Sequence, residues 1–220
     1  EAEGVVNRMG FSNEGHEAAF ERLKGLRVPS ALGVNIGANK DSEDFVADYV
    51  AGVKRFADLA DYLTVNISSP NTPGLRNLQA DEALTRLLDA VLNARAKAKT
   101  RVPTLLKTAP DLDEAAMDAI ARVIGATDLD GLIVSNTTIS RDPVAGLENA
   151  DEMGGLSGKP LFEKSIVALA QMRKRVGEAL TIIGVGGVYS GETPGETLRA
   201  VATLVLAYLC PVVAVPALPM

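Results

Sequence analysis

The stretch YLTVNISSPNTPGLR, residues 62–76, begins as a mostly apolar run and ends in a polar loop. A short and mostly continuous apolar run is typical of a parallel strand that is buried on both faces. Further runs of this kind occur at residues 31–36, 103–107, 131–135, 181–185 and 203–208. Residues 62–67 are therefore predicted to be one of six such strands.

Amphipathic patterns separate these runs. Apolar side chains recur every three or four positions in residues 41–60, 81–97, 113–124 and 164–176, which predicts helices. Alternating strands and helices indicate βαβ units and a parallel sheet, either a doubly wound open sheet or a (β/α)8 TIM barrel. No GxGxxG or GxxxxGK[ST] follows any strand, which weakens the nucleotide-binding open sheet.

The composition excludes several classes of protein. The 220 residues are 47% hydrophobic and 23% charged, as in a soluble globular protein. The net charge of −6 argues against a basic nucleic-acid-binding face, and nine aromatic residues without Trp argue against a stacking platform. The single Cys210 excludes an internal disulfide. The single His16 excludes a multi-histidine metal site, and no metal is predicted.

The two ends of the sequence carry different signals. The chain begins with Glu1 and shows no basic segment before an apolar run, so no signal peptide is expected. Residues 200–220 carry no charge and approach the length of a membrane-spanning helix, about 20 residues. Pro211, Pro216 and Pro219 would break such a helix. A buried strand over residues 203–208 is therefore favoured.

Polar residues stand where the predicted strands end, and ligands meet this edge in both architectures. Asn35, Asn66 and Asn136 recur at comparable places, and a buried asparagine without partners costs about 1–3 kcal/mol. Taken singly, these residues are ordinary turn formers. Together, the amides suit a planar ligand rich in carbonyl and N–H groups. Lys107 among them can stabilise a developing negative charge, and Gly187 lets backbone amides approach a phosphate.

Seven motifs carry a close resemblance to the class 2, quinone-dependent dihydroorotate dehydrogenases, which are FMN enzymes of pyrimidine (UMP) biosynthesis. The resemblance covers roughly residues 5–192, and the long run at residues 66–76 is its most specific part. The motifs are NRMGF (7–11), GVNIG (33–37), VNISSPNTPGLR (65–76), APDL (109–112) beside Lys107, VSNTT (134–138), GGLSGKPL (154–161) and IIGVGGV (182–188).

The resemblance implies an α/β fold, the (β/α)8 TIM barrel, with FMN over the carboxyl ends of the strands. About six of eight βα units are expected here, with the FMN-binding barrel in residues 1–192 and a divergent last strand and Pro-rich apolar tail in residues 193–220. It implies oxidation of dihydroorotate to orotate, in which a base removes the C5 proton while the C6 hydride passes to the flavin. Class 2 members use serine as the base, here Ser69, and a membrane quinone as the acceptor. Class 1 members place a cysteine there.

The resemblance also assigns the remaining site residues. Residues 69–76 are expected to form a lid, and Lys107 to lie near flavin N1. Contacts to the substrate are expected from Asn7, Arg8, Met9, Gly10, Phe11, Asn66, Asn71, Asn136 and Thr137. Contacts to FMN are expected from Asn35, Asn66, Lys107, Ser135, Ser157, Gly158, Gly187, Tyr208 and Leu209. A serine hydroxyl is a weak base without a partner, so a water or threonine relay from Ser69 is expected.

The two ends depart from the family pattern. Two strands and a membrane-docking segment that precede NRMGF in the family are not in these residues. Peripheral attachment to the cytosolic face of the cytoplasmic membrane, or to the mitochondrial inner membrane in a eukaryote, is expected through that absent segment. At the other end, the family glutamine is replaced by Leu206, and Pro194 and Gly195 should weaken a helix. Two alternatives stay open: another FMN barrel reductase acting on a dihydropyrimidine, and a truncated, non-catalytic fragment.

Overall fold

The computed structural model describes residues 2–27, 29–190, 192–199 and 202–206. Its strands are β1 (Gly4–Asn7), β2 (Gly33–Ile36), β3 (Tyr62–Asn66), β4 (Thr104–Thr108), β5 (Gly131–Val134), β6 (Gly155–Gly158), β7 (Thr181–Val185) and β8 (Leu204–Leu206). Its α-helices are α1 (His16–Leu23), α2 (Phe45–Phe56), α3 (Asp81–Arg95), α4 (Glu114–Gly125), α5 (Phe162–Val176) and α6 (Thr193–Arg199). Short 3-10 helices are η1 (Leu75–Gln79), η2 (Asp142–Val144) and η3 (Lys159–Leu161).

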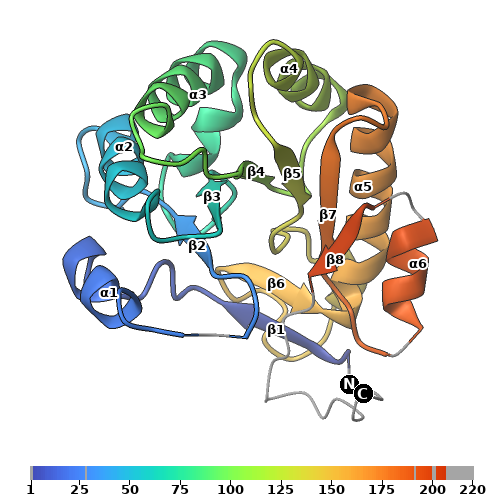
Figure 1. Ribbon diagram of the computed structural model, residues 1–220. Coiled ribbons are helices and arrows are strands. Elements are labelled where there is room, and N and C mark those ends of the chain that lie inside the picture. The colour runs from blue at the N-terminus through green and yellow to red at the C-terminus, as the bar shows by residue number, and fades with distance from the viewer. Residues whose placement is uncertain (1, 28, 191, 200–201, 207–220) are drawn as a thin grey trace.

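Six strands form one parallel sheet in the order β2-β3-β4-β5-β7-β8. In Figure 1 the helices α2, α3, α4, α5 and α6 form an arc around the outside of this sheet. A doubly wound sheet would carry helices on both faces. The architecture is therefore a partial (β/α)8 barrel, as predicted. Each of the predicted runs at residues 31–36, 62–67, 103–107, 131–135 and 181–185 overlaps a strand of the sheet, and β4 extends one residue beyond its run.

The main core lies between the outer face of the sheet and the helices. It contains large side chains that are almost fully buried, among them Tyr49, Leu63, Leu84, Leu106, Ile120 and Leu132. Helices α2 and α4 begin at acidic caps, because the side chains of Asp44 and Asp113 accept hydrogen bonds from the backbone N–H groups three residues later. In the four predicted helices, the apolar side chains that gave the prediction form the face that packs on the sheet.

A second, two-stranded sheet was not predicted. Strand β1 pairs with β6 in antiparallel register, so that Gly4 faces Gly158 and Asn7 faces Gly155. Gly158 has φ 87°, and a side chain there would lie 2.5 Å from the carbonyl oxygen of Glu3. Leu156 exchanges backbone hydrogen bonds with Thr138, which follows β5. The β1–β6 ribbon therefore lies at the carboxyl end of the barrel strands.

The carboxyl end corrects one prediction. The strand begins at Leu204 rather than at residue 203, and Leu204 is 56% exposed instead of buried. The reason is that β8 lies at the edge of the described sheet, with β7 as its one neighbour there. Helix α6 forms despite Pro194, which lies in the first turn, where proline is tolerated. The predicted phosphate contacts at Tyr208 and Leu209 fall outside the described residues, and no helix within the described ranges is long and apolar enough to cross a membrane.

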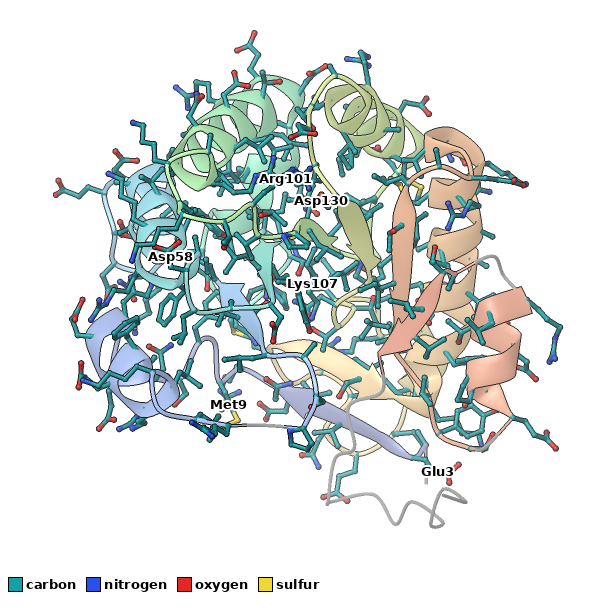
Figure 2. All side chains as sticks on the ribbon, in the orientation of Figure 1. Glu3, Met9, Asp58, Arg101, Lys107 and Asp130 are labelled. Atoms are coloured by element: carbon teal, nitrogen blue, oxygen red, sulfur yellow. The ribbon has the colours of Figure 1, made fainter. Side chains whose placement is uncertain are left out.

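A buried arginine joins the opposite end of the sheet to helix α3. Arg95 is 5% exposed and donates to the carboxylates of Asp128 (2.8 Å) and Asp130 (2.7 Å). Asp130, labelled in Figure 2, also accepts from Arg101 at 2.6 Å and from the backbone N–H of Thr104 at 2.8 Å. This cluster is at the amino ends of the strands, so its role is stability.

Replacing Asp130 by asparagine is expected to lower the free energy of unfolding by about 2–3 kcal/mol, because it leaves the buried Arg95 charge undercompensated. The matched control is Asp128→Asn, whose side chain is 76% exposed. That change is expected to cost less than about 1 kcal/mol. Urea unfolding of both variants measures the difference, and equal losses would contradict the distinction between them.

Candidate functional site

The amides at the strand ends lie together, as predicted from their positions. Asn66 is the last residue of β3 and stands in register with Lys107 of β4. Its side-chain N–H group donates to the Asn35 side-chain oxygen of the neighbouring strand β2 at 3.1 Å. Tyr49 of α2 holds the backbone here, because its buried hydroxyl donates to the Asn66 carbonyl at 2.6 Å. Burial raises the pKa of this tyrosine, which therefore stays a donor.

The network continues through Ser68, which the sequence did not single out. Its hydroxyl donates to the side-chain oxygen of Asn66 at 2.6 Å and accepts from the side-chain N–H of Asn136 at 2.8 Å. Asn136 in turn accepts from the backbone N–H of Thr137 at 2.8 Å. We refer to Asn35, Asn66, Ser68, Asn136 and Thr137 as the amide chain. The amide chain crosses the ends of β2, β3 and β5. Each of its hydrogen bonds is donated in the direction from Thr137 toward Asn35, which fixes the orientation of each amide.

Ser69 lies directly beside the amide chain. It is 6% exposed, and its hydroxyl oxygen accepts from the backbone N–H of Asn71 at 3.2 Å. Among the described residues, no side chain or carbonyl accepts the Ser69 proton. The Asn71 side chain donates to the Asn7 carbonyl at 3.2 Å, which ties this loop to β1. His16 is not a partner, because its ring packs edge-on against Phe56 of α2.

The motif at residues 7–11 divides between the site and the surface. Asn7 reaches the Ser69 loop through Asn71, and the Phe11 ring packs on Gly37, where a side chain would lie 2.5 Å away. Arg8 turns to solvent and pairs with Glu152 at 2.7 Å. Met9 is 76% exposed, and Gly10 is exposed with φ 67°. The structure thus brings Asn7 to the Ser69 loop and leaves Arg8, Met9 and Gly10 outside.

Arg8 and Met9 instead line a large cavity between β1 and the segment that precedes β6. Its volume is about 1220 Å³, and it is bounded by the β1 residues and by the segment from Val144 to Leu156. Ser69, Lys107 and the amides of Asn66 and Asn136 do not line it. The chemistry-bearing groups therefore define a site distinct from this cavity.

Lys107 is a largely buried cation at the centre of the sheet (Figure 2). No carboxylate or hydrogen-bond acceptor among the described residues contacts its ammonium group, and burial lowers the pKa of this lysine. A buried cation without a protein partner is costly unless an anion from a ligand compensates it. The lysine and the neighbouring amides therefore fit a planar group such as the FMN ring, which forms an anion when reduced.

Three further residues that are expected to contact FMN have packing roles of their own. The Ser157 hydroxyl donates to the Val5 carbonyl at 3.2 Å, and the buried Ser135 hydroxyl donates to the Asn136 carbonyl at 3.2 Å. Gly187 has φ 70°, and a side chain there would lie 2.5 Å from the backbone of Phe162. Contact with α5 therefore already requires glycine at this position, without a phosphate.

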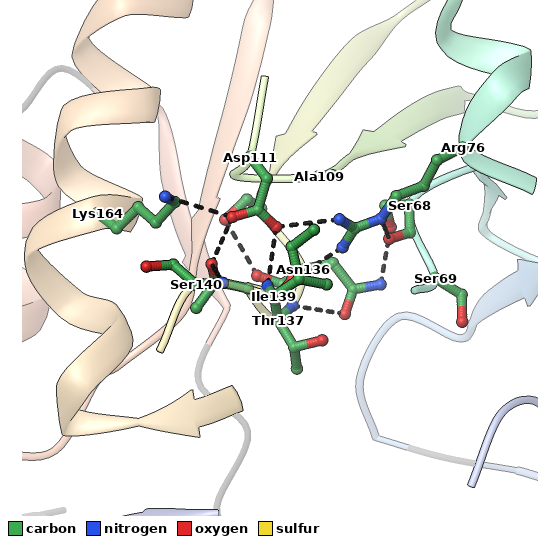
Figure 3. A network of polar contacts seen from close by, with 12 residues as sticks. Ser68, Ser69, Arg76, Ala109, Asp111, Asn136, Thr137, Ile139, Ser140 and Lys164 are labelled. Atoms are coloured by element: carbon green, nitrogen blue, oxygen red, sulfur yellow. Dashed lines mark hydrogen bonds and ion pairs between the residues drawn. The ribbon is translucent and has the colours of Figure 1, made fainter. Parts of the chain in front are cut away.

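A charged network lies beside Asn136 and Thr137 of the amide chain and was not predicted (Figure 3). Asp111 accepts hydrogen bonds from Arg76, from the Thr138 hydroxyl and from the Ile139 backbone N–H, and Lys164 lies 3.3 Å away. Burial disfavours the charged carboxylate, but these hydrogen bonds outweigh burial and hold the pKa of Asp111 below its ordinary value. The carboxylate is therefore ionised at neutral pH.

The fold defines a partial barrel of the (β/α)8 class, with the candidate site at the carboxyl ends of its strands. A family model described as dihydroorotate dehydrogenase matches residues 1–217. The chain belongs to the dihydroorotate dehydrogenase family.

Individual relatives agree with this assignment. The chain is 61% identical over 222 residues to a protein of Allorhizobium ampelinum named "Dihydroorotate dehydrogenase (quinone)", covering 99% of this chain. A protein of the same name from Rhizobium rhizogenes is also 61% identical, over 223 residues. The chain spans 61% and 62% of the length of these two relatives.

Solved structures give the same fold. The crystal structure of the Eimeria tenella enzyme DHODH in complex with ferulenol has a TM-score of 0.88 and 35% identity, and the match covers 94% of this chain and 62% of that one. The ligand-free type from the same organism also has a TM-score of 0.88, with 36% identity over 94% of this chain and 64% of that one.

Proposed function

We propose that the protein oxidises dihydroorotate to orotate with FMN as its cofactor and a quinone as the electron acceptor, a step in the biosynthesis of pyrimidine nucleotides (UMP). The observation that carries this proposal is that the buried Ser69 hydroxyl lies beside the amide chain, and that Lys107, which no described residue pairs with, stands in register with Asn66 of that chain. The names of the two bacterial relatives support the same activity and the same acceptor.

The residues of the site have distinct parts in this reaction. Asn66, Asn71 and Asn136 offer both donors and acceptors, so they can orient a pyrimidine ring that presents alternating carbonyl and N–H groups. The Ser69 oxygen takes the proton from C5 of dihydroorotate and passes its own hydroxyl proton through water to bulk solvent, because no described side chain or carbonyl accepts that proton. Bound FMN supplies the acceptor for the hydride from C6. Lys107 stabilises the negative charge that follows, because its ammonium group has no competing partner in the described part of the chain.

The identity of residue 69 supports the choice of acceptor. The resemblance associates serine at this position with quinone-linked members of the family, and cysteine with the others. Electron transfer to a membrane quinone implies peripheral attachment to the cytosolic face of the membrane. We assign that attachment to a segment outside these residues, and the FMN-binding barrel to residues 1–192.

The test is the visible spectrum of the purified protein. Flavin absorbance that dihydroorotate bleaches without oxygen, and that a soluble quinone restores faster than fumarate or NAD, is the expected result. A colourless protein would contradict the proposal for this chain. Bleaching by NADPH but not by dihydroorotate would instead indicate a reductase of another dihydropyrimidine.

A further inference from the structure

Arg76 connects three segments that follow neighbouring strands. Its Nε donates to the Ser68 carbonyl at 3.0 Å, one Nη to the Thr137 carbonyl at 3.1 Å, and the other Nη to Asp111 at 3.0 Å. Ser68 precedes Ser69 in the chain, and Thr137 ends the amide chain. A single guanidinium, 20% exposed, therefore fixes the backbone on both sides of the proposed reacting groups.

The bond to Ser68 also closes a loop. Residues 69–75 lie between its two ends, and the second end is anchored because Leu75 is fully buried. Gly74 has φ 75°, which glycine adopts without strain and which turns the chain into η1. Both ends of the loop are therefore fixed, one by Arg76 and the other by the burial of Leu75.

The geometry suits arginine and not lysine. The planar guanidinium presents N–H groups in a rigid fork, and here the fork is divided among two carbonyls and one carboxylate. An ammonium group could retain the ion pair with Asp111 but not all three directions. Asp111 is held from its other side by Thr138 and Lys164, so it offers the guanidinium a fixed anchor.

We propose that Arg76, held by Asp111, is a positioning residue that sets the Ser69 backbone relative to Thr137 and the amide chain. The proposal rests on the proposed function. It predicts that the chemical step is lost while the flavin site remains, because a displacement of about 1 Å in a reacting group costs about 100-fold in rate.

The experiment compares Arg76→Lys, Arg76→Gln and Asp111→Asn with the unchanged protein. One measurement is the single-turnover rate of flavin bleaching by dihydroorotate, set against reoxidation by a soluble quinone. The other is amide hydrogen exchange in peptides covering residues 68–76 and 136–141 of the flavin-free protein. The control is Arg175→Gln, since Arg175 also joins carboxylates, Asp118 and Glu114, but on the outer helices.

Both Arg76 variants are expected to slow bleaching by about 10- to 100-fold, to leave reoxidation unchanged, and to speed exchange at residues 69–75. Asp111→Asn should shift both measurements in the same direction by less, and Arg175→Gln should shift neither. Bleaching and exchange at the original rates in Arg76→Lys would overturn the proposal, as would equal slowing of both half-reactions. If Arg76→Gln does not fold, the lysine and asparagine variants decide.

Failure of the proposed function gives a different result. The unchanged protein would then show no bleaching by dihydroorotate. The exchange measurement would still decide whether Arg76 fixes the loop, because it needs neither flavin nor substrate.

Discussion

Replacement of Ser69 by alanine is expected to slow flavin bleaching by dihydroorotate by about 1,000-fold, within the range for removal of a positioned general base. The hydroxyl is buried, accepts one hydrogen bond from Asn71, and has no other described partner. Removing the oxygen therefore deletes the proton acceptor without breaking the amide chain, which runs through the neighbouring Ser68. Flavin content and the absorption spectrum should stay the same.

The measurement is anaerobic stopped-flow bleaching at saturating dihydroorotate, with Ser69→Ala beside Thr100→Ala. Thr100 is an exposed hydroxyl before β4, at the opposite end of the sheet, and its removal should leave the rate unaltered. Bleaching of the Ser69 variant at the original rate would refute the base assignment. Loss of flavin in that variant would show that Ser69 instead holds the cofactor.

The parallel sheet could be predicted from sequence because each strand carries its own signal. Residues 62–67 are apolar throughout apart from Thr64 and Asn66, and burial on both faces follows from that pattern alone. The meeting of Asn35 with Asn66 was predictable for a related reason. Parallel strands bring their carboxyl ends to one edge, and an amide in an apolar strand requires a partner.

The β1–β6 ribbon could not be predicted in this way. Its pairing joins Gly4 to Gly158, so the signal lies in two short segments far apart in the chain. Strand β6 reads GLSG, with two glycines in four residues, which is unfavourable for a strand by local preference. Contact with the loops after β3 and β5 overrides that preference. The Arg76 network escaped prediction because two of its acceptors are backbone carbonyls, which every residue has.

The exposure of β8 had a different cause. The pattern of residues 203–208 is apolar and correctly indicates a strand, but burial depends on what lies beside it. Sequence periodicity describes a segment and not its neighbours in space. The same limit applies to Lys107, because its position at a strand end does not show whether neighbouring segments bury its ammonium group.

Replacement of Lys107 by methionine is expected to stabilise the flavin-free protein against unfolding and to slow the reaction of the flavin-loaded protein. Without flavin, the variant should gain about 1–3 kcal/mol in free energy of unfolding at pH 7, because a buried ammonium group that no described residue pairs with is replaced by an apolar group. With flavin, bleaching by dihydroorotate should slow by about 100- to 1,000-fold, the effect of removing one donor to a developing negative charge. If Lys107 served only in packing, its replacement would not both stabilise the flavin-free protein and slow bleaching.

The pH dependence gives an independent check on the same residue. Burial lowers the pKa of Lys107 in the folded state below its ordinary value of 10.5, so the unfolded chain binds this proton more strongly. The destabilisation is therefore fully present below the folded-state pKa and is relieved as the pH rises toward 10.5. Urea unfolding of the flavin-free protein should show this rise, and Lys107→Met should remove it. The exposed Lys97→Met is the matched control and should keep it. A loss of stability in Lys107→Met would mean that the ammonium group has a stabilising partner in the protein. Its charge would then not need a ligand to compensate it.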